Sequence, residues 1–355
     1  MRGGQRGAIT CNGASVAITL DDCTFSHCYM DPNNKNNQNN HGVCIGGSTF
    51  SATVRRCRFV GNKVAAFGHV LNASTVSDSI FEGNVIEANA ATFPTDYKTV
   101  LDCGSAIRCS FVSNRVTRTG TTTGTSCAAL VKTTGSLVGC TFDGNSASVT
   151  LDDGCGGTPV AGLVFVSGNV SAGIAHCTFR GNSAPVAVRR TDGNKNSGAY
   201  LLTLVNDVFS DEGYPPLAVN AGMNASVYGC HVLGSVMPGF DETASCVASA
   251  VRVITDEVPL FVRRPVVGET AYGVMLNGCL AGRRAAVEVF TDANGVWGFA
   301  DADGTFRKLA DHSSLTPAEP CVKYADAFGD VAPIGRHIPG ALQTYYRGGL
   351  SVTVR

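Results

Sequence analysis

Two acidic pairs are the residues of this chain that come closest to a hydrolytic set. They are Asp21-Asp22 and Asp152-Asp153. Hydrolysis of a glycosidic bond uses two carboxyl groups, about 5–5.5 Å apart for retention and about 6.5–9.5 Å apart for inversion. Neighbouring residues of a strand point to opposite faces, so each pair could serve only across adjacent strands or from a loop.

A second set suits elimination rather than hydrolysis, because a polysaccharide lyase needs a base and cations beside the carboxylate of its substrate. It comprises Arg189, Arg190, Asp192 and Lys195. These residues lie in a segment rich in Gly and Asn, which is typical of a solvated turn. We keep this set, with Asp152 and Asp153, as the catalytic candidates, while expecting solvated turns at both places.

The other chemistry-bearing residues give no metal, cofactor or phosphate pattern. The seven His residues form neither an H-x-H nor an H-x-x-x-H pair, and those at 176 and 231 are expected to project outward from strands. Residues 301–304 resemble part of a calcium loop but lack its later Glu. Trp297 is expected to pack within a hairpin rather than to hold a sugar. The sequence therefore predicts no bound metal and no cofactor.

Composition argues against two classes of partner. A net charge of −1, with 15% charged residues, leaves no electrostatic footprint for nucleic acid. No run of 18 apolar residues occurs, so no transmembrane helix is expected. Residues 1–9 lack the apolar core of a signal peptide and resemble the interior of a repeat, as in a sequence that begins inside a longer protein.

The elements that must position these residues follow from a repeated phrase, Cys-x-Phe-x-x-Asn. Its copies place Phe at six positions: Phe25, Phe59, Phe81, Phe111, Phe142 and Phe179. Weaker copies follow at Phe209 and Val232. The spacing runs from 22 residues (Phe59 to Phe81) to 37 residues (Phe142 to Phe179). A recurring period of this size indicates stacked structural repeats.

Each copy alternates apolar and polar residues between Gly, Asn, Asp and Ser, which predicts short strands and tight turns. The Cys and Phe of a phrase share a face, which we expect to be interior, with the residue between them facing water. A coil of about 30 residues with three short strands predicts an all-β, right-handed parallel β-helix whose coils lie about 4.8 Å apart.

In such a coil, equivalent side chains stack along the axis. The six Phe rings should form one aromatic column, and the Cys residues a column of buried thiols rather than disulfides. The Asn residues should form a structural ladder at the bend, because Asn tolerates the left-handed conformation and stacked amides bond to one another. They are Asn62, Asn84, Asn114, Asn145 and Asn182. The alternative is a row of amides that grips a sugar.

The chain divides into two parts. We expect residues 1–245 to form the repeat region and residues 246–355 to hold the last coils and an antiparallel β cap. Polar inserts bulge from the coil at 31–40, 117–126 and 189–196. Asn294-Gly295 lies between two apolar runs, which is a strong hairpin signal.

The phrase, together with Gly-Ala-Ile at 7–9, resembles the repeat of polymorphic outer-membrane proteins and related bacterial surface β-helices. The end of the chain resembles the closing segment of choice-of-anchor Q domain proteins. The matching pieces are 259–262, 319–321, 326–329 and 338–341. The resemblance implies a secreted or cell-surface bacterial protein of the pectin-lyase-like superfold. Of the polygalacturonase-like motifs found in that superfold, only Asp-Asp occurs here.

These observations lead us to expect a non-catalytic surface protein that serves as a rigid scaffold, adhesin or glycan-binding platform. Its expected partner is a polysaccharide or a glycan of a host or cell surface. One alternative is a polysaccharide lyase or glycoside hydrolase that works in a groove along the coil. Another is a tailspike-like trimer that grips glycans. Acidic and basic side chains converging in one exterior groove would favour the enzyme.

Overall fold

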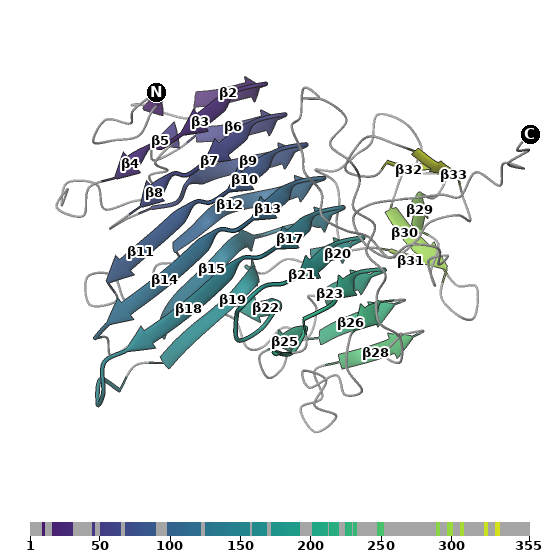
Figure 1. Ribbon diagram of the computed structural model, residues 1–355. Coiled ribbons are helices and arrows are strands. Elements are labelled where there is room, and N and C mark those ends of the chain that lie inside the picture. Colours follow the sequence, from purple (N-terminus) through teal and green to yellow (C-terminus); the bar gives the residue numbers. More distant parts are fainter. Residues whose placement is uncertain are drawn as a thin grey trace, which may run out of the picture.

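The computed structural model shows an all-β chain whose parallel strands stack into a β-solenoid (Figure 1). The structure describes residues 9–10, 16–30, 45–46, 50–64, 68–89, 98–121, 125–156, 158–168, 172–191, 201–211, 213–219, 224–228, 230–232, 247–251, 289–291, 297–300, 306–308, 323–325 and 331–333. Within these ranges there is no helix. The predicted fold class, an all-β parallel coil, is confirmed.

An eight-stranded parallel sheet carries the Cys-x-Phe phrase, one strand from each copy. Its register places Phe59 opposite both Phe25 and Phe81. The strands are β3 (Thr24–Ser26), β7 (Arg58–Val60), β10 (Ile80–Glu82), β13 (Ser110–Val112), β17 (Thr141–Asp143), β21 (Thr178–Arg180), β24 (Val208–Phe209) and β27 (His231–Val232). The two weaker copies of the phrase, in β24 and β27, therefore continue the same sheet.

A five-stranded parallel sheet forms the second side of the coil. It consists of β4 (Tyr29–Met30), β8 (Lys63–Val64), β11 (Val85–Asn89), β14 (Arg115–Gly120) and β18 (Ser146–Leu151). The next coil continues it only as an isolated bridge between Ser146 and Ser183. Three-sided coils thus extend over the five repeats from β4 to β18.

A thirteen-stranded sheet covers the rest of the coil. Its strands are β2 (Val16–Asp21), β6 (Phe50–Arg55), β9 (Leu71–Ser77), β12 (Lys98–Ile107), β15 (Thr125–Thr133), β16 (Leu137–Val138), β19 (Thr158–Ser167), β20 (Ala172–Ala175), β22 (Val188–Thr191), β23 (Leu201–Val205), β25 (Leu217–Val219), β26 (Asn224–Tyr228) and β28 (Val247–Val251). A short pair, β1 (Ile9–Thr10) with β5 (Ile45–Gly46), is also parallel.

The core is built on a stack of Phe rings. From Phe25 to Phe209, successive ring centroids are 4.6–5.3 Å apart and the ring planes differ by only 2–9°. Such stacked pairs are worth about 0.5–1.5 kcal/mol each beyond the burial of their area. Beside the rings, five Cys residues of the phrase are fully buried and form no disulfide; they are Cys57, Cys109, Cys140, Cys177 and Cys230.

The Asn side chains join each coil to the next. Asn84 Nδ2 donates to Asn114 Oδ1 at 2.9 Å and to the Phe59 carbonyl at 2.8 Å, while the Asn84 backbone N–H donates to the same Oδ1. The pattern repeats from Asn62 onward. It ends at Asp211, whose Oδ2 accepts from Asn182 Nδ2 at 3.1 Å and from the Tyr214 hydroxyl.

The left-handed residues at this bend are not the Asn residues, so this detail of the prediction is wrong. Positive φ occurs one residue earlier, at Gly61, Gly83, Ser113, Gly144 and Gly181. Glycine suits these positions because it has no Cβ to clash. The Asn that follows is therefore free to turn its amide inward and along the axis.

The expectation that the middle residue of each phrase faces water holds only at the first coils. Thr24 is exposed and Arg58 is partly exposed, but Ser110, Thr141 and Thr178 are buried. The middle residues of the phrase are therefore buried from Ile80 of β10 onward, while Val112, Asp143 and Arg180 of the same strands stay partly exposed. The alternation of apolar and polar residues along a strand predicts which residues share a face of the sheet. It does not predict whether other parts of the chain cover that face.

The predicted hairpin signals near the C-terminus correspond to antiparallel strands. β29 (Val289–Thr291), β30 (Trp297–Ala300) and β31 (Phe306–Lys308) form a three-stranded sheet, and β32 (Lys323–Ala325) pairs with β33 (Val331–Pro333). Their role as a cap over the last coil stays a prediction. In the described part of the chain, no helix has the length and apolar character needed to cross a bilayer.

Candidate functional site

The predicted acidic pair Asp152-Asp153 lies in the turn that follows β18, with both residues exposed. Asp152 Oδ2 accepts a hydrogen bond from the Thr121 hydroxyl at 2.6 Å. Thr121 follows β14, so this bond joins the corresponding turns of two neighbouring strands. The arrangement is that of a solvated turn, and the described residues place no second carboxylate pair beside it.

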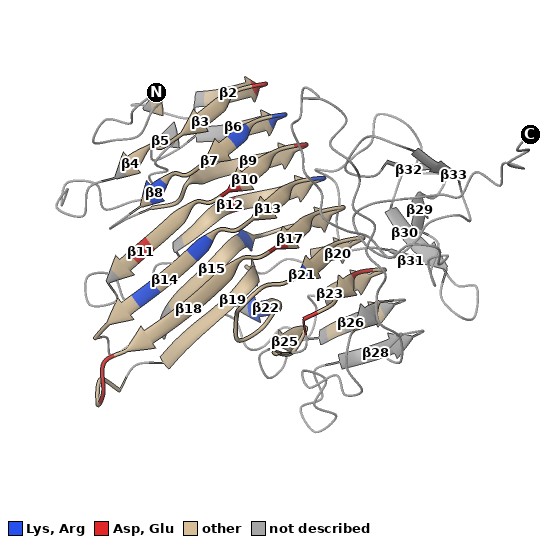
Figure 2. Ribbon diagram, in the orientation of Figure 1, with Lys and Arg blue, Asp and Glu red and all other residues tan. Residues whose placement is uncertain are grey.

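The predicted basic cluster is only partly described. Arg189 and Arg190 are neighbours in β22 and therefore point to opposite faces of the sheet. Arg190 is 1% exposed, and its Nη2 lies 3.5 Å from the Gly168 carbonyl. Asp192 and Lys195 lie outside the described residues. Asp152 and Asp153 follow the five-stranded sheet, whereas the two Arg residues belong to the thirteen-stranded sheet (Figure 2).

His176 does not project into solvent as the sequence suggested. It has a positive φ at the corner before Cys177 and is fully buried, with its Nε2 3.4 Å from Asn206 Nδ2. A side chain at the corner between two strands can thus be buried against the neighbouring coil, here against Asn206. The side chain of His231 lies outside the described part of the structure.

A cluster that sequence reasoning missed lies on the outer side of the thirteen-stranded sheet. His69 Nδ1 is 2.7 Å from the Thr99 hydroxyl, and His69 Nε2 is 3.6 Å from Asp102 Oδ2. Lys132 Nζ donates to the same Asp102 oxygen at 2.9 Å. His69 is 4% exposed. A carboxylate thus lies between an imidazole and an ammonium group, an arrangement that can orient a ring and move a proton.

The register of the sheet extends this cluster across four strands. Asp102 of β12 is paired in register with Lys132 of β15. Lys132 is in turn paired with Phe165 of β19, and Phe165 with Arg189 of β22. Burial lowers the pKa of the Arg189 guanidinium, and its buried Nε has no hydrogen-bond partner among the described residues. One predicted candidate, Arg189, therefore shares an outward row with His69 and Asp102.

A small apolar cluster adjoins this row. Cys127, Ala129 and Phe165 pack together apart from the main core, and Ala129 lies opposite Thr99 in the register. The signal that could have revealed the row is the equivalence of Asp102 and Lys132, 30 residues apart in successive coils. The long, irregular strands of this sheet hide that equivalence in the sequence.

A second exterior feature is a polar groove of about 360 Å³ on the five-stranded sheet. It is lined by Glu87, Ala88, Arg115, Thr117 and Thr119. These residues come from β11 and β14, where Glu87 lies opposite Thr117. The groove therefore follows the hydrogen-bonded junction between two adjacent coils.

Charge alternates from strand to strand at the groove: Figure 2 shows basic residues on β8 and β14 and an acidic residue on β11 between them. Glu87 accepts from Lys63 Nζ at 2.9 Å and from Arg115 Nη2 at 2.7 Å. The hydrogen bond from Lys63, with the charges of Lys63 and Arg115, lowers the pKa of the Glu87 carboxyl against the opposing effect of partial burial. Glu87 is thus held ionised, with fixed donors on both sides.

Comparisons with models of known families, with curated proteins and with solved structures found no match to this chain. Among the described residues, no group of three or more His, Cys, Asp or Glu side chains is placed to hold a metal ion.

Proposed function

We propose that this chain is a rigid, non-catalytic scaffold that binds a glycan along the outer face of its five-stranded sheet. The observation that carries the proposal is the groove lined by Glu87, Arg115, Thr117 and Thr119. It is open, polar and supported from beneath by buried residues of the same strands, among them Ile86 and Val116.

The lining offers what a sugar requires. Hydroxyl groups of a glycan both donate and accept, and the groove supplies a carboxylate acceptor, a guanidinium with several donors, and two threonine hydroxyls. Tyr29 of β4, on the same sheet, is 47% exposed and offers an aromatic face on which a sugar ring can stack.

Rigidity supports affinity here. The stacked Phe rings and the Asn ladder hold successive coils in one register, so the groove residues need little ordering when a ligand arrives. Preorganisation of this kind reduces the entropic cost of binding. A flat, repetitive face also suits a repetitive polymer.

The proposal is tested with a glycan array, followed by titration of any hit. Replacing Thr117 and Thr119 together by Val removes both hydroxyls while keeping the side-chain shape, and Arg115→Ala removes the guanidinium. Loss of one hydrogen bond costs about 1.4 kcal/mol, so we expect affinity to fall about tenfold or more for each variant.

Arg58→Ala is the matched control, because Arg58 is an outward cation on the eight-stranded sheet. It should bind as the wild type does. Equal affinity of the groove variants and the wild type would place binding elsewhere. If the wild-type chain binds no glycan on the array, the proposal that it binds a glycan is wrong.

An extracellular or cell-surface location in bacteria belongs to the same proposal, as does membership of the pectin-lyase-like superfold. These rest on the sequence resemblance and on the parallel solenoid, which is the architecture that the resemblance implies. An adhesive role would follow if the glycan is displayed on a host or neighbouring cell.

A second candidate function, cleavage of an acidic polysaccharide, is favoured by the row that contains His69, Asp102, Lys132 and Arg189. There His69 would take or give the proton, with Asp102 orienting the imidazole. Lys132 and Arg189 would hold the substrate carboxylate. Phe165, between these two cations in the register, would limit access of water.

This candidate is tested by incubating the chain with a panel of uronic-acid polysaccharides and measuring new reducing ends and unsaturated products. Activity that disappears in His69→Gln and survives in Arg115→Ala would assign catalysis to this row. Absence of both kinds of product across the panel would leave the non-catalytic scaffold as the better account.

A further inference from the structure

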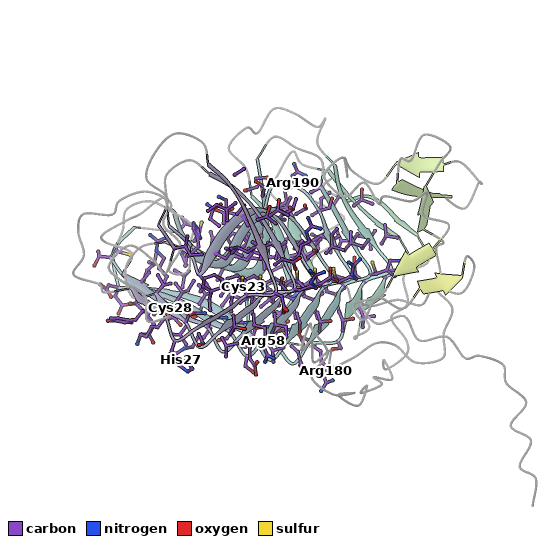
Figure 3. The ribbon with its side chains drawn as sticks, turned by 90° about the horizontal axis from the view of Figure 1, so that it is seen from above. Cys23, His27, Cys28, Arg58, Arg180 and Arg190 are labelled. Carbon is purple, nitrogen blue, oxygen red and sulfur yellow. The ribbon has the colours of Figure 1, made fainter. Side chains whose placement is uncertain are left out.

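The thiols of Cys23 and Cys57 lie side by side in the coils that contain β3 and β7. The register pairs Thr24 with Arg58, and the Arg58 backbone N–H donates to the Cys23 carbonyl at 2.8 Å. Each thiol also lies over the carbonyl two residues before it, at Asp21 for Cys23 and at Arg55 for Cys57. The two side chains therefore have the same direction in successive coils, and Figure 3 shows Cys23 on the inner side of the sheet.

This separation is compatible with a disulfide. Neighbouring strands of a sheet lie about 4.7–4.9 Å apart. Disulfides join residues whose Cα atoms are about 4.4–6.8 Å apart. The Cα atoms of in-register cysteines on adjacent coils therefore fall within the permitted range, near its lower limit.

Cys23 differs from the other thiols of the column by its access to solvent. Cys23 is partly exposed, whereas Cys57, Cys109, Cys140 and Cys177 are buried. Burial raises the pKa of Cys57 to about 11, and it raises the pKa values of Cys109 and Cys140 well above the ordinary value for a thiol, which suppresses the thiolate at each. Among the described Cys residues of the column, only Cys23 both lies beside another thiol and is accessible to a dissolved oxidant.

We propose that Cys23 and Cys57 form a reversible disulfide that fastens the first coil to the second when the protein meets a small-molecule disulfide. The Cys23 thiolate attacks one sulfur of the oxidant, which releases one thiol and leaves a mixed disulfide on Cys23. Cys57 gives up its proton to water and attacks Cys23 Sγ, which releases the second thiol. Two protein thiols are oxidised and one oxidant disulfide is reduced to two thiols.

The cross-link would close residues 23–57 into a ring and join β3 to β7 covalently. An oxidising surrounding would thus fasten these two coils to each other, and a reducing one would release them.

The test uses the folded, full-length chain incubated with oxidised glutathione. Remaining thiols are blocked with iodoacetamide, and the chain is digested with chymotrypsin and analysed by mass spectrometry. Cleavage after Leu20, Phe25, Phe50 and Phe59 isolates Cys23 in fragment 21–25 and Cys57 in fragment 51–59. We expect these two fragments to be joined, and to separate after treatment with dithiothreitol.

The chain supplies its own control pair. Cys109 and Cys140 also occupy adjacent positions of the column but are fully buried. Fragment 102–111, which also contains Cys103, should be joined to fragment 138–142 at least about tenfold less often than fragment 21–25 is joined to fragment 51–59, because all the thiols of the control fragments are buried away from a dissolved oxidant. Cys23→Ser should abolish the link while keeping the fold, since Ser79 already occupies this column in the third coil.

Two results would overturn the proposal. One is a glutathione adduct on Cys23 with Cys57 still free, which would mean that the second thiol cannot reach the first. The other is equal cross-linking of the Cys109 and Cys140 fragments, which would mean that oxidation follows opening of the whole coil rather than the geometry of its end.

Discussion

Asp207 places a carboxyl group in the dry interior at a position where most coils have Cys. It is fully buried, and its Oδ1 accepts a hydrogen bond from the Cys177 backbone N–H at 2.7 Å. Ser79 has the same role in an earlier coil, where its hydroxyl accepts from the Cys57 N–H. Burial raises the pKa of the Asp207 carboxyl well above its usual value. The protonated form is therefore the one that the folded chain accommodates.

Asp207→Asn is expected to change how stability depends on pH. In the wild type, the unfolded chain loses the Asp207 proton near pH 3.9, whereas the folded chain keeps it to a higher pH. Wild-type stability should therefore fall as pH rises through this window, by up to about 1.4 kcal/mol per pH unit. Asn keeps the acceptor oxygen and does not titrate, so the variant should gain relative to the wild type above about pH 4.

Urea unfolding of both proteins at a series of pH values measures this difference. The wild type and the variant should have similar stability at about pH 3.5, where Asp207 is mostly protonated in both the folded and the unfolded wild-type chain. Their stabilities should diverge as pH rises. Parallel pH profiles would show that Asp207 is ionised inside the fold and stabilised by contacts of another kind.

At the level of the elements, the Asn ladder adds side-chain hydrogen bonds between successive coils to the backbone hydrogen bonds of the parallel sheets. Asn114 accepts two hydrogen bonds from Asn84 through Oδ1 and donates from Nδ2 to Asn145 and to the Phe81 carbonyl. It is 1% exposed. No water can replace these partners, so each lost bond leaves a buried donor or acceptor unpaired.

Asn114→Ala is expected to destabilise the fold by about 3 kcal/mol or more, because it strands the Asn84 donors and the Phe81 carbonyl. Asn182→Ala, at the partly exposed end of the ladder, should cost about 1 kcal/mol, since water can reach its neighbours. Chemical denaturation of the two variants measures the ratio. Equal losses would show that ladder position, and hence burial, does not control the contribution.

The repeated phrase was sufficient to predict which Phe residues stack. Each coil contributes one Phe at the same position of the phrase, so the rings align wherever successive copies of the phrase are in register. The row from Asp102 to Arg189 could not be predicted in the same way. It belongs to the thirteen-stranded sheet, where coil-to-coil spacing changes from 30 residues at Thr99–Ala129 to 24 at Phe165–Arg189. The burial of Thr141 and His176 likewise depends on what covers the solenoid, which alternation within one strand cannot report.

At the level of the whole molecule, the described surface offers little apolar area for self-association. Among the described residues, Tyr29 is the one large hydrophobic side chain that is exposed. Stable oligomer interfaces bury about 1,200–2,000 Å² with an apolar centre. From the described part of the solenoid we therefore predict an independent rod, with the tailspike-like trimer as the alternative to be tested.

Sedimentation velocity is expected to show a monomer of 36.8 kDa at micromolar concentration. A stable species of three times that mass would contradict this expectation and revive the trimeric alternative. Tyr29→Ser should leave the sedimentation coefficient unchanged, because a single exposed ring is too small to hold chains together.

The side chain of Asp211 ends the Asn ladder, although β27 continues the eight-stranded sheet beyond it. Each Asn amide before Asp211 donates a hydrogen bond to the side-chain oxygen of the next coil, so the ladder has a direction. A carboxylate accepts such a bond but has no amide hydrogen to donate to a further coil. A designer who wished to carry the ladder into the coil of β27 would first have to place Asn at residue 211.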